Sequence, residues 1–287
     1  MTGSKKRKYK IKKVFNNNVV LAIKEGNFQN ESILLGKGIG FSKSKGDIIK
    51  ADKVTIERKF TPVTDEKKEV YQQLLTKVDE KVIGVTEEII AIVSSKLDEK
   101  LDSHIHIALA DHISFSLKRI QEGMDVVNPF LHETKTLYSE EYELAKEAVG
   151  MIEERFDLSI PEEEIGFITL HIHSARENKG VSKTVKYTSL IKKMVDKVEE
   201  ELEVEFSYES LNYARLVTHL KFGLERIEQN EVNQNPLLDI IKTNFPQAYK
   251  MAVNLSKIIE RELDLEVPED EIGYLAMHLQ RLRKELD

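Results

Sequence analysis

The first 60 residues alternate apolar and polar side chains at the short period that is typical of β-strands. Such runs cover residues 9–15, 19–23, 32–35 and 54–60, separated by features that include an asparagine cluster and a glycine-rich bend. Short alternating runs joined by turn-forming residues predict four strands in a small antiparallel sheet. A sheet of this size buries little apolar surface by itself, so we expect the chain to form a homodimer.

Beyond a linker predicted at residues 61–66, the apolar spacing changes to that of helices. One stripe repeats every four residues along the chain: Ile105, Leu109, Ile113 and Leu117. This spacing predicts the buried face of a helix. Pro161 and Pro268 are each followed by three acidic residues. Both positions predict helix starts, because proline suits the first helical turn and carboxylates favour the positive end of the helix dipole.

An internal repeat organises the helical part. Residues 157–171 match residues 264–278 at 8 of 15 positions, and residues 109–120 match residues 216–227 at 6 of 12. Both matches have the same offset of 107 residues, which indicates two copies of one domain. We predict a multidomain fold, with a small antiparallel β-sheet followed by two duplicated all-α helical-bundle domains. The predicted segments are a basic β domain (1–60), the linker (61–66), a first helical domain (67–177) and a second helical domain (178–287).

The charge of the chain is divided unevenly. Residues 1–60 hold 15 Lys and Arg against 5 Asp and Glu, a net charge of +10, whereas the other 227 residues hold 28 against 45, a net charge of −17. A compact basic segment on an acidic body predicts a module that binds a polyanion, and the alternative is a solubilising basic tail. With no cysteine, no long apolar run and no secretory signal, we expect a cytoplasmic chain without membrane insertion.

The repeat divides the eight histidines into two classes. Two pairs occupy equivalent positions in the two copies: His112 with His219, and His171 with His278. The other four have no histidine at the equivalent position: His104, His106, His132 and His173. A function that both copies share therefore points to the paired histidines. The alternative for these residues is a structural role as hydrogen-bonded members of the core.

We expect no metal ion and no cofactor at the histidines. Two H-x-H pairs, at 104/106 and 171/173, lie in helical patterns. Residues two apart on a helix point about 200° away from each other, so they cannot share an ion. The chain also has no nucleophile motif and no glycine-rich phosphate loop followed by Lys and Ser or Thr. These absences argue against an enzyme.

Two acidic residues precede the paired histidines on the same predicted helices. Glu164 lies seven residues before His171, and Glu271 lies seven residues before His278. A carboxylate on the same helix face is placed to orient an imidazole or to hold its tautomer. The alternative is a solvated acidic helix start.

Two stretches of the basic domain, KVFNNNVVLAI and LLGKGIGFSKSKGD, resemble the RNA-binding co-antiterminator domain of bacterial transcriptional antiterminators of the beta-glucoside and sucrose operon type. The duplicated helical domain resembles the regulation domain of the same family, which responds to the sugar phosphotransferase system (PTS). The resemblance covers nearly the whole chain in the right order. The similarity is greatest to members that control glucose operons, in the segments HIHIALADHI and KTLYSEEYELAKEA.

The resemblance implies a mechanism. The basic domain would dimerise and bind an RNA hairpin in the leader of a nascent mRNA, which stabilises that hairpin against an overlapping terminator. The sugar-specific permease, here that for glucose, would act negatively on the first regulation domain, and the phosphocarrier HPr would act on the second. The positions that match the family's phosphorylated histidines are His112, His171, His219 and His278.

For the RNA surface, the resemblance points to eight residues: Lys13, Asn16, Asn17, Asn18, Gly36, Lys37, Gly38 and Phe41. Many relatives have arginine where Lys37 stands, and lysine keeps the charge but lacks the planar fork for a bidentate contact. Thr218 stands where the first copy has Asp111, directly before the paired histidine; the sequence leaves open whether the two copies differ as phosphate acceptors. Asparagine, glycine and an aromatic ring suit the unpaired bases of an RNA hairpin.

Two rival hypotheses belong to other classes of protein. One is a helical metal-dependent hydrolase with a basic targeting module. The other is a DNA-binding activator of a sugar operon that carries the same regulation domains. Residues 1–60 show no helix-turn-helix pattern, which argues against the second rival.

Overall fold

The computed structural model describes residues 8–26, 31–51, 55–61, 65–230 and 234–286. The chain forms two compact units. The first holds Met1–Asn128 and Glu140–Val181, and the second holds Pro129–Ser139 and Ser182–Asp287. In the part of the chain that the structure describes, no helix is both long and apolar enough to cross a membrane.

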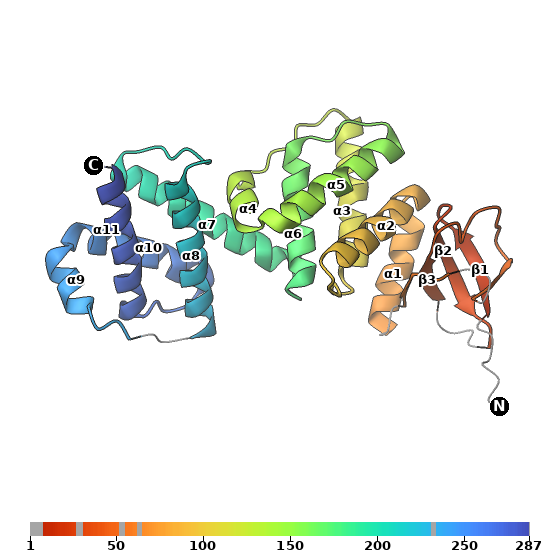
Figure 1. Cartoon of the computed structure of the whole chain (residues 1–287), viewed down its shortest axis with the longest axis horizontal. Coiled ribbons are helices and arrows are strands. Elements are labelled where there is room, and N and C mark those ends of the chain that lie inside the picture. The colour runs from red at the N-terminus through yellow and green to blue at the C-terminus, as the bar shows by residue number, and fades with distance from the viewer. Residues whose placement is uncertain (1–7, 27–30, 52–54, 62–64, 231–233, 287) are drawn as a thin grey trace. The chain divides into compact units, whose positions relative to one another are not determined.

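A five-stranded antiparallel sheet begins the first unit (Figure 1). Its strands are β1 (Lys8–Val14), β2 (Val19–Lys24), β3 (Glu31–Leu35), β4 (Ile48–Lys50) and β5 (Arg58–Phe60). Their order in the sheet is β4-β1-β2-β3-β5. The register of β1 against β2 shifts between Ile11 and Lys13, so the end of β1 that leads into the asparagine turn is irregular.

The first three predicted strands are confirmed to within one or two residues at each end. The fourth is shorter than predicted, since β5 holds only Arg58–Phe60, and Val54 of the predicted run lies outside the described residues. The short strand β4 was not predicted. It has only three residues, and its single buried side chain, Ile49, gives no alternation to read from the sequence.

The sheet packs on both of its faces. One face closes over a small core of its own: Tyr9, Ile11, Val20, Ala22, Leu34, Ile39 and Ile49. Apolar side chains of the other face, including Phe15, Val19 and Leu21, join the core of the first helical domain. The sheet therefore gains the apolar burial that it cannot supply alone from helices of the same chain.

Five helices complete the first unit: α1 (Asp65–Lys77), α2 (Glu80–Lys96), α3 (Ile105–Gln121), α5 (Ser139–Phe156) and α6 (Glu162–Arg176). The apolar stripe predicted on α3 is confirmed, because all four of its residues are buried: Ile105, Leu109, Ile113 and Leu117. Helix α6 begins directly after Pro161, in agreement with the predicted helix start. Helices α3 and α6 pack against each other, and this contact brings the site histidines together.

The second unit contains α4 (Leu131–Leu137), α7 (Val181–Leu202), α8 (Leu211–Gln229), α9 (Leu238–Asn244), α10 (Pro246–Leu263) and α11 (Glu269–Leu286). Helix α11 begins directly after Pro268, as predicted. Helix α9 packs on α10 and α11, whereas α4, its equivalent in the repeat, packs on α8. The buried hydrogen bond from Tyr213 Oη to Glu133 Oε1 (2.8 Å) ties α4 to α8.

The fold class predicted from the sequence is confirmed: a small antiparallel sheet followed by duplicated helical domains. The structure places α4 with the second unit, although the repeat assigns it to the first copy. The predicted linker falls largely on residues 62–64, which lie outside the described residues.

Candidate functional site

The paired histidines of each copy meet in space. In the first unit, His112 on α3 and His171 on α6 have ring centroids 4.8 Å apart, with the rings tilted by 38°. In the second unit, His219 on α8 and His278 on α11 stack at 3.6 Å, with 19° between the ring planes. The repeat singled out these four residues, and the fold joins them as two imidazole pairs.

A buried carboxylate fixes the first pair. Glu164, only 1% exposed in its side chain, accepts hydrogen bonds from His112 Nε2 (2.9 Å) and from Arg119 Nη2 (2.6 Å). Burial by itself would raise the pKa of Glu164, but the hydrogen bonds from His112 and Ser116 and the charge of Arg119 lower it. Glu164 therefore orients the imidazole of His112, rather than that of His171 on its own helix.

The partner ring of His171 is neutral and poorly solvated. Its Nδ1 is buried and has no hydrogen-bond partner among the described residues. Burial, together with the nearby imidazoles of His112 and His104, lowers the pKa of His171 to about 3. A neutral imidazole keeps a free lone pair at neutral pH, which a phosphate acceptor requires.

The second pair lies in a more open and more basic setting. The buried Glu271, the counterpart of Glu164, is held by Arg226 through Nε (3.0 Å) and Nη2 (2.7 Å). Burial, followed by the charges of His219, Arg226 and Arg281, lowers the pKa of His278 to about 4. Burial and nearby arginines also lower the pKa of His219. Both rings of this pair are therefore neutral at physiological pH.

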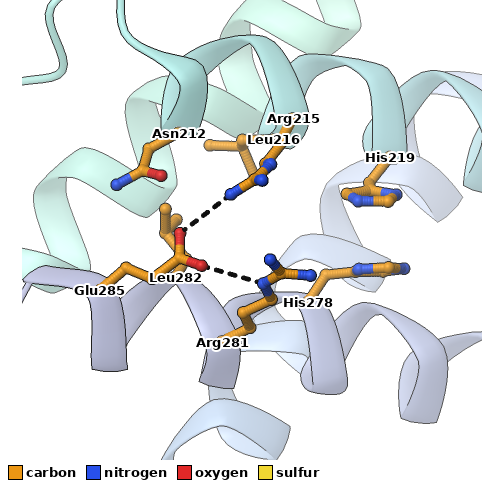
Figure 2. A pocket seen from close by; sticks show the side chains of 8 residues that line it. All are labelled: Asn212, Arg215, Leu216, His219, His278, Arg281, Leu282 and Glu285. Atoms are coloured by element: carbon orange, nitrogen blue, oxygen red, sulfur yellow. Dashed lines mark hydrogen bonds and ion pairs between the residues drawn. The ribbon is translucent and has the colours of Figure 1, made fainter.

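A pocket opens beside the second pair (Figure 2). Its lining consists of the two histidines together with Asn212, Arg215, Leu216, Arg281, Leu282 and Glu285. Glu285 forms ion pairs with Arg215 Nη1 (3.5 Å) and Arg281 Nε (3.0 Å). Cationic side chains thus stand next to a pair of neutral nucleophiles.

The low pKa of His171 predicts a loss of stability in acid. The pKa of His171 is 6.5 in the unfolded chain and about 3 in the folded chain. Between these pH values the unfolded chain therefore binds a proton that the folded chain does not. Above pH 6.5 His171 therefore makes its full contribution to the free energy of unfolding. As the pH falls below 6.5, that contribution decreases by up to about 1.4 kcal/mol per pH unit. Urea unfolding at several pH values between 4.5 and 7.5 should show a shallower pH dependence in His171→Gln than in the wild type. The same slope in both proteins would contradict the assignment.

The histidines without an equivalent in the repeat have structural partners. His106 stacks on Phe60 (3.7 Å between centroids) and its Nδ1 lies 2.9 Å from both carboxylate oxygens of Glu87. The remaining three also pair locally: His104 with Asp102, His173 with Glu141, and His132 with the ring of Tyr208. Among the described residues, no group of three or more His, Cys, Asp or Glu is arranged to hold a metal ion.

Seven of the eight residues predicted to contact RNA lie on two loops of the sheet, and Lys13 lies near the end of β1. Backbone hydrogen bonds join the asparagine turn to the glycine-rich bend, from Gly36 N to Asn18 O (3.0 Å) and from Gly40 N to Asn17 O (2.9 Å). Asn18 Oδ1 also accepts the N–H of Gly38 (3.0 Å). Phe41 is 65% exposed, and Lys37 on the same glycine-rich bend is exposed as well. The two loops thus form one surface that presents a cation and an aromatic ring.

Part of this predicted RNA surface is engaged by α2. Lys13 Nζ lies 2.8 Å from Glu80 Oε1, and Asn18 Nδ2 donates to Glu88 Oε1 (2.9 Å). Asn16 lies against the backbone of α2 at Gly84, where an added Cβ would approach Asn16 Nδ2 to 2.6 Å. Acidic residues of α2 therefore bind the side chains of Lys13 and Asn18, which the sequence analysis predicted to contact RNA.

The functional residues that the sequence prediction missed are arginines. Arg119 and Arg226 occupy equivalent positions in the repeat, which was a usable signal for their shared pairing with Glu164 and Glu271. Arg215 and Arg281 have Ala108 and Ser174 at the equivalent positions. Because the two copies differ there, comparison of the copies could not single out these two arginines.

Known proteins are similar to this chain in both its N-terminal sheet and its helical domains. Residues 9–69 match the CAT RNA binding domain, and residues 87–175 and 192–282 match the PRD domain. The chain is 36% identical over 279 residues to the transcription antiterminator LicT of Bacillus subtilis, covering 96% of this chain and 99% of LicT. It is 40% identical over 288 residues to the PtsGHI operon antiterminator of the same species, covering 100% of both chains.

Two further relatives carry the name GlcT. Protein GlcT of Staphylococcus aureus is 32% identical over 281 residues, which cover 97% of this chain and 98% of the relative. The crystal structure of GlcT CAT-PRDI is 44% identical in sequence, covers 59% of this chain and 98% of that chain, and superposes with a TM-score of 0.49.

A basic RNA-binding sheet joined to two helical regulation domains defines a regulator of transcription. The chain belongs to the family of transcription antiterminators that combine a CAT RNA binding domain with two PRD domains. The family predicted from the sequence is thereby confirmed, and two of these relatives are named as antiterminators.

Proposed function

We propose that the chain binds a leader RNA hairpin as a cytoplasmic homodimer and prevents termination in a PTS operon, with glucose as the sugar. It acts as a regulator without catalytic activity of its own. The paired loops of the sheet carry this proposal, because they present Lys37 and Phe41 at an exposed surface. Lysines supply phosphate contacts, and an exposed ring stacks on an unpaired base.

The RNA surface that we propose comprises the eight residues predicted from the sequence. Four of them are exposed: Asn17, Lys37, Gly38 and Phe41. Lys13, Asn16 and Asn18 contact α2, and Gly36 is buried between β3 and the segment before β5. If all eight contribute, the described conformation is that of the RNA-free protein, and RNA competes with α2 for three of them.

The two histidine pairs are the proposed sites of phosphorylation: His112, His171, His219 and His278. Neutral imidazoles with lowered pKa, shown by His171 and His278, are competent nucleophiles at neutral pH. A phosphate adds about two negative charges to a helix contact, by analogy with other phosphorylated side chains. Such a charge between α3 and α6, or between α8 and α11, would shift the packing of the unit and through it the availability of the sheet.

Phosphohistidine mapping tests this assignment. We expect phosphorylated HPr to label the second pair and the glucose permease domain to label the first, when peptides are analysed without exposure to acid. Substitution of His132, which lies outside both pairs, by glutamine should leave the pattern unchanged. Absence of label from all four histidines would refute the phosphorylation proposal.

A gel-shift comparison separates the RNA proposal from its nearest rival. The full chain should bind the leader hairpin as RNA and bind the same sequence as duplex DNA far more weakly. A preference for the DNA would favour an operon activator that acts on DNA.

A further inference from the structure

The pocket beside His219 and His278 differs from its counterpart in the first copy. Arg215, Arg281 and Glu285 line it, and the equivalent positions hold Ala108, Ser174 and Asn178. These arginines are therefore a feature of the second copy alone. A feature that both copies needed for folding would be expected in both.

We propose that Arg215 and Arg281 form a binding site for the phosphoryl group in the second regulation domain, and that Glu285 occupies this site until the phosphoryl group arrives. The inference rests on the proposed function, since it concerns the phosphate that His219 or His278 accepts. It adds the residues that hold this group and the reason why the two copies differ.

The geometry of Glu285 supports an anion site. Figure 2 shows its carboxylate paired with both guanidinium groups. The distances are 3.5 Å to Arg215 Nη1 and 3.0 Å to Arg281 Nε. Both arginines are substantially exposed, with 40% and 65% of their side chains accessible. Ion pairs between exposed groups are weak, so a phosphoryl group with about two negative charges can displace a single carboxylate.

The position of the pocket fits the transfer step. Neutral His219 or His278 attacks phosphorus with its free lone pair, a new N–P bond forms, and the N–P bond to the donor histidine breaks. The donor imidazole leaves with the electron pair of that bond and becomes neutral, while the acceptor becomes a phosphoimidazolium. Guanidinium groups bind phosphate oxygens through paired N–H donors, so they would stabilise both the transferring group and the product.

The first copy offers a different setting for the same chemistry. There the His112 Nε2–H bonds to Glu164, which also holds Arg119. No arginine stands at the positions equivalent to Arg215 and Arg281. Phosphorylation of the first pair is thus an internal control, because it should not depend on the pocket of the second unit.

The test compares R215A/R281A with K257A/K284A in the full chain. The control removes the same charge from exposed positions of α10 and α11 that do not line the pocket. With phosphorylated HPr as donor, we expect R215A/R281A to slow labelling of His219 and His278 by about tenfold or more, given the strength of charge-assisted hydrogen bonds. K257A/K284A should label at the wild-type rate, and E285Q should label faster. Equal rates in the wild type and R215A/R281A would overturn the proposal while the proposed function stands.

A second measurement tests phosphate binding by the pocket in the absence of the phosphoryl donor. Titration with inorganic phosphate, followed by NMR of the imidazole signals, should shift His219 and His278 with saturation in the wild type and in K257A/K284A. R215A/R281A should lose this saturation. If the wild type binds phosphate but HPr leaves it unlabelled, the anion site is supported and the assigned donor is wrong. If the wild type shows no saturable shift, the site is refuted.

Discussion

Replacement of Glu80 and Glu88 by glutamine is expected to tighten binding of the leader hairpin by the full chain about tenfold. In the described structure these carboxylates hold Lys13 at 2.8 Å and Asn18 at 2.9 Å. Each contact must break before RNA takes the same polar groups, which lowers the apparent affinity. The exposed pair with Lys13 contributes less than about 1 kcal/mol, whereas a hydrogen bond to a charged group such as Glu88 contributes about 1.5–3 kcal/mol.

The matched control for E80Q/E88Q is E143Q/E147Q. It removes the same charge from carboxylates of α5 that pair with Lys146 and Lys96 instead of with the sheet. Fluorescence anisotropy at a fixed salt concentration gives the affinities. If both double variants tighten RNA binding equally, the effect is a general change of charge, and the competition between α2 and RNA is refuted.

A methyl group at Gly36 is expected to disrupt the RNA surface through the sheet itself. An added Cβ would meet the backbone oxygen of Thr55 at 2.2 Å, so the segment before β5 must move away from β3. Overpacking of this kind costs about 1–3 kcal/mol. Gly36→Ala should therefore lower the free energy of unfolding of the first unit and weaken RNA binding at least tenfold, as measured by urea unfolding and anisotropy.

Alanine substitutions at Gly38 and Gly46 distinguish a loss of stability from the loss of an RNA contact. Both have positive φ, +69° and +101°, and both have open space where a Cβ would lie. Alanine at either position costs about 1–3 kcal/mol of backbone strain. If Gly38 approaches RNA closely, Gly38→Ala weakens RNA binding and Gly46→Ala does not. Equal RNA affinity of the two variants would remove Gly38 from the proposed surface.

The sequence was most informative where a pattern was repeated. The strands with clear alternation, the stripe on α3 and the helix starts after Pro161 and Pro268 all follow from local chemistry that the fold leaves unchanged. The constant offset between the copies identified the histidine pairs, because a residue found at the same position in both copies is expected to serve a function that both copies share.

Features that depend on contacts between distant segments could not be predicted in this way. The sequence left Glu164 either as a carboxylate that orients His171 on its own helix or as part of a solvated helix start. Instead it is buried and bonds to His112 on α3, 52 residues away. The contacts of Glu80 and Glu88 with the asparagine turn arise from packing of the sheet on α2. Nothing in the local pattern of α2 distinguishes these carboxylates from solvated ones.

Terminator read-through in purified transcription, on the leader template of the chain's own operon, tests the central claim most directly. Increasing amounts of the wild-type chain should raise the fraction of full-length transcript. E80Q/E88Q should do so at lower concentration, and Gly36→Ala should require at least tenfold more protein than the wild type. An unchanged fraction of full-length transcript with the wild type, at concentrations that saturate the hairpin, would contradict the account.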